Sequence, residues 1–148
     1  MHESEVLTGI VATKGSRLLR DDIQAVLSQY DLSAMDWSML AVLAAARNGV
    51  QHAYVAEELH VKAPFVTALA GPLLKRKLIR SVPSQFDARG KLLALSPDGK
   101  KLRRTVENAL NRRLAQILSG VSLNELKAYD KLMRTVIANH TAPPDAMS

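Results

Sequence analysis

The chain has 148 residues, of which 47% are hydrophobic and 23% are charged, and it contains no cysteine. This balance is typical of a soluble globular protein, and no apolar run approaches the roughly 20 residues that a membrane-spanning helix needs. The lack of cysteine excludes disulfides, thiolate metal sites and thiol nucleophiles. The N-terminus starts acidic, without the basic-then-apolar order of a signal peptide, so we expect a cytoplasmic protein.

The net charge of +6 is unevenly distributed along the chain. Residues 62–113 contain 13 Lys and Arg against three acids, whereas the rest of the chain contains seven against 11. A basic block within one domain predicts a polyanionic partner. Charge alone also fits a solvated helix surface, so this observation needs support from the predicted elements.

The N-terminal part of the chain predicts two helices. Apolar residues recur at three-to-four spacing over 3–30, which predicts a long amphipathic helix. After a break at 31–32, Ser33 and Asp36 form a capping-box pattern that predicts the start of a second helix, which Asn48-Gly49 ends. Little sequence precedes the first helix to cover its apolar stripe, so we expect that stripe to pack against the C-terminal helices or a partner.

The middle of the chain predicts a helix-turn-helix followed by a β-hairpin. A short helix over 53–59 and a helix over 63–77 are joined by a tight turn, and Pro64 suits the first turn of the second helix because the missing N–H would have no partner there. Pro72 removes one backbone hydrogen bond and predicts a bend near 68–72. Two short strands over 78–82 and 91–95, with a polar loop between them, complete the hairpin.

The C-terminal part predicts two more helices. Ser96-Pro97-Asp98 is a strong helix start, Gly120 ends that helix, and Ser122 with Glu125 forms a second capping box. The tail over 141–148 is expected to be frayed. The prediction is one domain over 1–148, mainly α with a small β-hairpin, in which a winged helix-turn-helix core at 33–96 is flanked by dimerisation helices at 3–30 and 97–139. A symmetric homodimer is the simplest way to bury the long terminal helices.

The helix over 63–77 is the predicted DNA-reading element. Because it follows a short helix through a tight turn, its N-terminal half can enter a major groove. Thr67 can hydrogen-bond to a phosphate or a base edge, and Phe65 can contact a thymine methyl group. Lys62 and Ala68 are expected on the same outward face. A simpler interpretation, which the sequence leaves open, is that Phe65 packs in the core.

The hairpin loop is the second predicted contact with DNA. Arg89 stands at its tip, where a guanidinium can reach a narrow minor groove, and Asp87 can orient it. Lys75 and Lys91 lie beside these elements and can neutralise phosphates. An ordinary solvated hairpin also fits, since an isolated D-x-R pattern is weak evidence.

Four segments together resemble the MarR (multiple antibiotic resistance regulator) family: VAEELHV at 55–61, FVTAL at 65–69, LLKRKLI at 73–79 and DARGKLLALSPDG at 87–99. The resemblance implies a homodimer whose recognition helices enter successive major grooves of a pseudo-palindromic operator. It implies that Arg89 is the wing arginine with Asp87 as its partner, and that Thr67 is a recognition-helix polar residue. Ala68 stands where the family often has Arg, and Gly71-Pro72 replaces an Asp-Arg-like pair, so the base-reading contacts differ from the family pattern.

The resemblance also implies a ligand, because many members of the family release DNA when a small aromatic or phenolic acid binds between the dimer helices and the winged domain. In this chain Lys14 and Arg17 can supply cations for a carboxylate, and Trp37 can supply a ring for stacking. The simpler alternative is that Trp37 is a core residue and that the two cations lie on the surface or in the dimer interface.

The sequence gives little support to an enzyme. The four His residues, at 2, 52, 60 and 140, form no short metal-ligand pair, and G-x-S-x-G, Walker and G-x-G-x-x-G motifs are absent. No cofactor and no metal site are predicted, although a zinc site built from distant residues stays open. The function predicted is therefore a DNA-binding transcriptional regulator, a repressor by the family's common mode. The alternative is a winged-helix adaptor that binds protein and not DNA.

Overall fold

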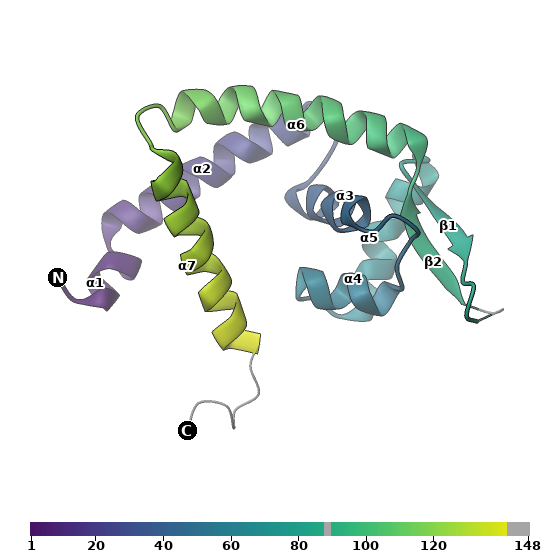
Figure 1. The fold of residues 1–148 in the computed structure, drawn as a ribbon. Helices are drawn as coiled ribbons and strands as arrows, with labels where there is room; N and C mark the ends of the chain where they lie inside the picture. Colours follow the sequence, from purple (N-terminus) through teal and green to yellow (C-terminus); the bar gives the residue numbers. More distant parts are fainter. Residues whose placement is uncertain (88–89, 142–148) are drawn as a thin grey trace, which may run out of the picture. The chain divides into compact units, whose positions relative to one another are not determined.

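The computed structural model describes residues 1–87 and 90–141 (Figure 1). Its elements, in chain order, are α1 (Glu3–Thr8), α2 (Ile10–Ser28), α3 (Ala34–Ala45), α4 (His52–Leu59), α5 (Ala63–Lys75), β1 (Ile79–Pro83), β2 (Lys91–Leu95), α6 (Pro97–Ile117) and α7 (Leu123–Thr141). The predicted class, mainly α with one β-hairpin, is confirmed. The chain forms two compact units, Met1–Leu114 and Ala115–Ser148. Within the described ranges, no helix is both long and apolar enough to span a membrane.

Both predicted capping boxes are present. Asp36 N donates to Ser33 Oγ at 3.0 Å, and Ser33 N donates to Asp36 Oδ2 at 2.8 Å. At the start of α7, Glu125 N donates to Ser122 Oγ at 3.2 Å and Ser122 N donates to Glu125 Oε2 at 2.7 Å. Each box satisfies two backbone N–H groups that the helix leaves without partners, so it fixes the residue at which the helix begins.

The helix predicted over 3–30 is interrupted. Gly9 has an extended backbone, with φ −65° and ψ 160°, and it separates α1 from α2. A Cβ atom at this position would collide with the Glu5 carbonyl oxygen, so the close turn between the two helices needs glycine. The break leaves no mark in the apolar periodicity, because apolar residues continue on both sides of it.

The turn between α4 and α5 and the end of α5 both use left-handed residues. His60, with φ 55°, ends α4, and Val61 N donates to Ala56 O at 2.9 Å. Lys77, with φ 58°, follows α5, and Leu78 N donates to Leu73 O at 3.0 Å. The second helix therefore ends at Lys75, two residues before its predicted end, and it stays one helix through Pro72.

The hairpin is antiparallel, with Ile79 opposite Leu95 and Val82 opposite Leu92. Val50 adds a single bridge to its edge, where Val50 N donates to Leu93 O at 2.9 Å and Leu93 N donates back at 2.8 Å. Because side chains alternate along a strand, Ile79 and Leu93 join the core while Arg80 and Val82 lie on the other face of the hairpin.

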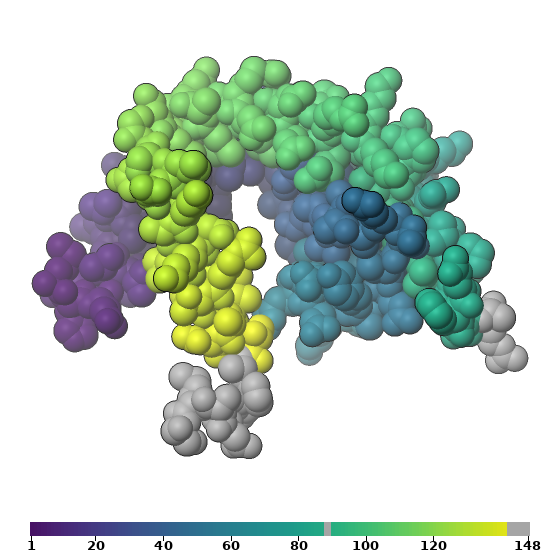
Figure 2. Space-filling view, viewed as in Figure 1, coloured from purple at the N-terminus to yellow at the C-terminus, as the bar shows by residue number. Residues whose placement is uncertain are grey.

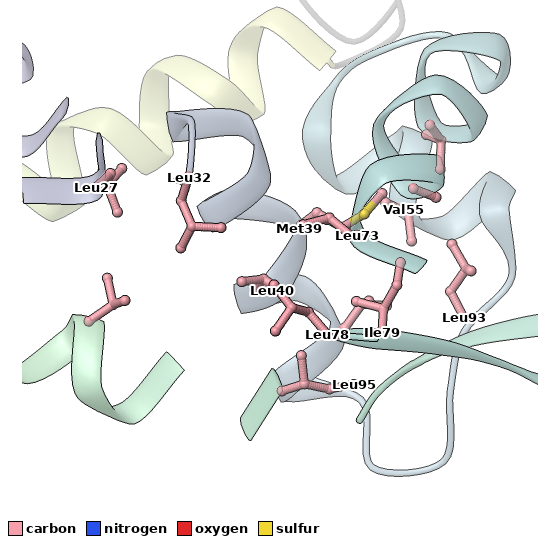
Figure 3. Packing of buried hydrophobic residues seen from close by; sticks show 14 of the residues in the cluster. Leu27, Leu32, Met39, Leu40, Val55, Leu73, Leu78, Ile79, Leu93 and Leu95 are labelled. Carbon is pink, nitrogen blue, oxygen red and sulfur yellow. The ribbon is translucent and has the colours of Figure 1, made fainter. Parts of the chain in front are cut away.

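One hydrophobic core joins these elements within residues 1–114. Figure 3 shows its buried side chains meeting from α2, α3, α4, α5 and the hairpin, and Figure 2 shows α3, α4 and the strands packed into one body. Ser96 attaches α6 to this core: its Oγ lies 2.6 Å from Lys77 O and accepts from Gly99 N at 2.9 Å. A Cβ on Gly99 would collide with Leu78 O, so α6 begins directly against the end of the helix-turn-helix.

Candidate nucleic-acid interface and adjacent hollow

The N-terminal half of α5 presents an exposed surface above a buried one. Val66, Ala70 and Leu73 are buried, whereas Thr67 and Ala68 are exposed and Phe65 is 46% exposed. The simpler interpretation that placed Phe65 in the core is therefore wrong. Exposed Lys62 precedes the first turn, and Phe65 N donates to its carbonyl at 3.0 Å. The four residues predicted on the outward face are all exposed.

Tyr54 on α4 is an exposed aromatic residue that the sequence analysis did not single out; its exposed fraction is 45%. Its neighbours Val55 and Ala56 are buried, so the helix turns Tyr54 away from the core. The periodicity of this short helix could have predicted the exposure of Tyr54, because Tyr54 falls outside the apolar stripe formed by Val55, Ala56 and Leu59.

The hairpin loop is described on both sides of its tip. Gly90 N donates to Asp87 O at 3.0 Å and Ser84 N donates to Gly90 O at 2.9 Å, which brings the two strands together. Asp87 and Lys91 are exposed, and Phe86 is 99% exposed. Arg89, the predicted minor-groove residue, lies outside the described residues.

Two basic residues at the end of α5 have different surroundings. Lys75 is exposed. Arg76 instead donates from Nη1 to Asp31 O at 2.7 Å and from Nη2 to Tyr30 O at 3.0 Å, which ties the end of α5 to the end of α2. This contact could not be predicted from the sequence, because its partners lie about 45 positions away and no local pattern marks them.

The residues predicted to hold an aromatic acid lie on two elements. Lys14 and Arg17 are exposed on α2, where Arg17 pairs with Asp21 at 3.6 Å. Trp37 on α3 packs against the core, and Arg103 Cζ lies 5.6 Å from the centre of its ring, a cation–π contact. The crevice itself stays a prediction.

A separate hollow of about 1020 Å³ lies between the C-terminal end of α3, the hairpin and the start of α6. Its lining includes five basic side chains, Arg47, Arg80, Lys100, Arg103 and Arg104, and none of the described lining residues is acidic. Gly49, with φ 88°, forms one edge, where an added Cβ would lie 3.1 Å from both Leu92 Cβ and Val82 Cγ2. The basic block alone does not predict this arrangement, because Arg47 follows α3, Arg80 lies on β1 and the other three basic residues lie on α6.

Within residues 1–87 and 90–141, no group of three or more His, Asp or Glu side chains is placed to hold a metal ion. The zinc alternative therefore has no ligand set in the part of the chain that the structure describes.

No family model and no curated protein sequence matches the chain. Solved structures do match its fold. A MarR-family transcriptional regulator from Rhodococcus sp. RHA1 is 16% identical at a TM-score of 0.77, with 92% of this chain and 95% of that one covered. CouR from Rhodococcus jostii RHA1, bound to p-coumaroyl-CoA, is 18% identical at a TM-score of 0.73, with 92% of each chain covered.

A third similar structure is a mutant of S. aureus MepR bound to an oligodeoxyribonucleotide; it is 21% identical at a TM-score of 0.64, with 87% of this chain and 94% of that one covered. Three matches that each span almost all of both chains, together with the observed helix-turn-helix and hairpin, define the architecture. The chain has the winged helix-turn-helix fold of the MarR-family transcriptional regulators.

Proposed function

We propose that the protein is a DNA-binding transcriptional regulator. The observation that carries this proposal is the accessible N-terminal half of α5, held on a buried core beside a hairpin in the most basic part of the chain. The oligodeoxyribonucleotide bound to the MepR mutant supports the proposal, because that protein shares the fold.

In the proposed complex, the first half of α5 lies in the major groove. Thr67 donates to a base edge or phosphate, Phe65 contacts a thymine methyl group, and Lys62 contacts the backbone at the helix start. Ala68 lies at the same surface without a polar group. Lys75 at the far end of α5 adds a phosphate contact.

The hairpin makes the second contact of the proposed complex. Arg89 enters the minor groove, Asp87 orients its guanidinium, and Lys91 binds a phosphate where the second strand begins. The recognition helix and the wing together span one half of a pseudo-palindromic operator.

The proposed regulator is a homodimer. On α1 and α2, Leu7, Ile10, Val11 and Leu18 expose between 46% and 87% of their surface, and α7 exposes a second set, Leu126, Tyr129, Leu132, Val136 and Ile137. Apolar stripes of this length on solvent-exposed helices mark interaction surfaces. A second copy of the chain, related by twofold symmetry, covers the same stripes on both protomers.

The proposed mode of action is repression in the cytoplasm, with release of the operator by a small aromatic acid held by Lys14, Arg17 and Trp37. CouR, bound to p-coumaroyl-CoA, supports the idea that a protein of this fold takes a small ligand. Because repression and release are the common mode of the family that the sequence resembles, they are proposed together with the fold-level function.

One binding experiment tests the proposal. DNA selected by the purified protein from a random duplex library is titrated at two salt concentrations, and the affinity should fall steeply as salt rises because phosphate contacts release counterions. The variant Arg89→Ala should weaken binding to the selected site while size-exclusion chromatography still shows a dimer. Equal affinity of wild type and Arg89→Ala would remove the minor-groove contact from the proposal.

A second candidate function has one observation in its favour. The outward face of α5 carries Phe65 and Ala68 and no arginine, which suits a protein-binding surface as well as a DNA-reading one. A folded chain that selects no duplex from the library even in dilute buffer supports this adaptor and contradicts the DNA-binding proposal.

A further inference from the structure

The hollow beside the hairpin gathers positive charge that is only partly compensated. Among its five basic side chains, Arg103 pairs with Glu107 at 3.5 Å, while Arg47, Arg80 and Lys100 make no ion pair with any residue that the structure describes. The Nε atom of Arg103 is buried and has no hydrogen-bond partner among the described residues. A buried donor without an acceptor costs free energy, so the contacts of this guanidinium within the described residues do not satisfy all of its donors.

The arrangement of the basic residues is also unfavourable for the fold by itself. Lys100, Arg103 and Arg104 share one face of α6 at spacings of three and four, where like charges repel. Arg80 joins them from β1. A helix that needed charge only for solubility would not require these residues to converge with another element on one concave surface, so the convergence points to a bound anion.

The dimensions of the hollow favour a small molecule over a DNA backbone. Its volume of about 1020 Å³ lies at the upper end of the range for small-molecule sites. The loop ending at Gly49 forms one side of it, and the hydrogen bonds between Val50 and Leu93 attach the chain beyond that loop to the hairpin. Walls on several sides suit a small ligand, which its site mostly encloses, better than a duplex, which meets a protein along an extended surface.

The apolar part of the lining defines the rest of the ligand. Leu43, Val82 and Leu92 contribute an apolar wall beside the cations. We propose that this hollow binds a small molecule that joins at least two adjacent negative charges, as in a diphosphate, to an apolar or planar body. Arginine suits this chemistry because its planar guanidinium binds a phosphate through two parallel hydrogen bonds. A single carboxylate would compensate only one or two of the cations. The site does not depend on DNA binding.

Adenosine diphosphate is the probe for this site, because it carries adjacent phosphates on a planar body. Calorimetric titration at fixed ionic strength should give a dissociation constant on the order of 100 µM or tighter, with pyrophosphate weaker, benzoate at least about tenfold weaker and adenosine undetectable. The only tryptophan of the chain, Trp37, contacts Arg103, so its fluorescence should change on addition of adenosine diphosphate. No binding at millimolar probe, or benzoate as tight as adenosine diphosphate, overturns the proposal.

Neighbouring lysines provide a matched pair of variants. Lys100 lines the hollow and Lys101 does not, although both are exposed residues of α6. Lys100→Ala and Arg80→Ala should each weaken adenosine diphosphate binding about tenfold, the cost of one charge-assisted contact, whereas Lys101→Ala should leave it unchanged. Equal losses for Lys100→Ala and Lys101→Ala would mean that general surface charge, and not the hollow, attracts the probe.

The same samples distinguish this inference from the proposed function. DNA affinity is measured for wild type and for each variant alongside probe binding. If the wild-type protein binds DNA but not adenosine diphosphate, the proposed ligand site is contradicted and the proposed regulatory function is not. If the wild-type protein binds adenosine diphosphate but no duplex DNA, the proposed ligand site is supported and the proposed regulatory function is contradicted.

Discussion

Helices α3 and α7 begin in the same way and have opposite surroundings. Each starts with a serine and an acid three residues later that exchange hydrogen bonds with the backbone. Along α3, Met39, Leu40 and Leu43 are buried, whereas no residue of α7 is buried within the single chain. The capping box therefore determines where a helix begins, while contacts distant in the sequence determine what it packs against.

The largest expected effect is on the buried side of this comparison. Leu40→Ala removes a fully buried side chain and should lower the free energy of unfolding by about 2–5 kcal/mol, since it leaves a cavity. Urea denaturation at several protein concentrations measures the change. Because Leu40 lies inside the chain's own core, the loss should be the same at every concentration; a loss that varies with concentration would place this residue at an interface.

The exposed side of the comparison should respond to protein concentration. Val136→Asp places a charge in the apolar stripe of α7 and should weaken the proposed dimer by about a hundredfold or more, because burying an unpaired charge is costly. Analytical ultracentrifugation measures the dimer, with Ala138→Asp, at an exposed position on the opposite face of the same helix, as the control. Removal of residues 122–148 should give monomers, so a truncated chain that still elutes at the dimer size would contradict the proposed interface.

Variants of Arg76 test how far a contact between residues distant in the sequence positions α5. Arg76→Ala removes two charge-assisted hydrogen bonds to the end of α2 and should cost about 1–2 kcal/mol of stability, a range that allows for the exposure of the side chain. Lys75→Ala, one residue away and exposed, should change stability by less than about 0.5 kcal/mol. Urea denaturation measures the free energy of unfolding of both variants. Equal losses for Arg76→Ala and Lys75→Ala would show that the hydrogen bonds of Arg76 do not stabilise the fold.

The distinction between contacts near in the sequence and contacts distant in it explains which features the sequence could predict. Both capping boxes and the tight turn before α5 depend on residues within a few positions of one another, and their patterns were correctly interpreted. The hairpin, also correctly predicted, pairs residues from 8 to 16 positions apart, which is still close in the sequence. The interruption at Gly9 depends on a backbone turn so close to the Glu5 carbonyl oxygen that a Cβ atom would not fit, and apolar periodicity does not reveal such a contact. The stripe of the N-terminal helices was identified from the same periodicity.

The features that the sequence did not predict depend on distant residues. The partners of Arg76 lie at the end of α2, and the cations of the hollow come from the end of α3, from β1 and from α6. Arg76 and four of the five cations of the hollow fall in the basic block over 62–113, which was assigned to a polyanionic partner or to solvent, whereas Arg47 lies outside the block. Only the tertiary arrangement separates a basic residue that holds two helices together from one that lines a concave surface.

The two capping boxes give a smaller and graded test. Ser33→Ala should lower the free energy of unfolding of the whole core by about 1 kcal/mol, because α3 is part of that core. Ser122→Ala should reduce the helical circular dichroism signal of α7 and leave the core's urea midpoint unchanged in the monomeric Val136→Asp background. Equal shifts of the midpoint for both variants would mean that α7 unfolds together with the core.

The smallest expected effect is the pH dependence of the box at α7. Hydrogen bonds from the Ser122 backbone and then from its hydroxyl lower the pKa of Glu125 below its usual value of 4.5. A carboxyl group with a lowered pKa in the folded state stabilises the helix start above its unfolded pKa, and that contribution is lost as the pH falls through the folded value. The helical signal of α7 should therefore decrease on acidification in the wild-type protein.

Glu125→Gln keeps an acceptor for the Ser122 N–H without titrating, so its helix start should not respond to acid. Carbon-13 NMR of the glutamate carboxyl groups measures the titration directly, and a Glu125 pKa at or above 4.5 would show that the box does not hold the carboxylate in solution.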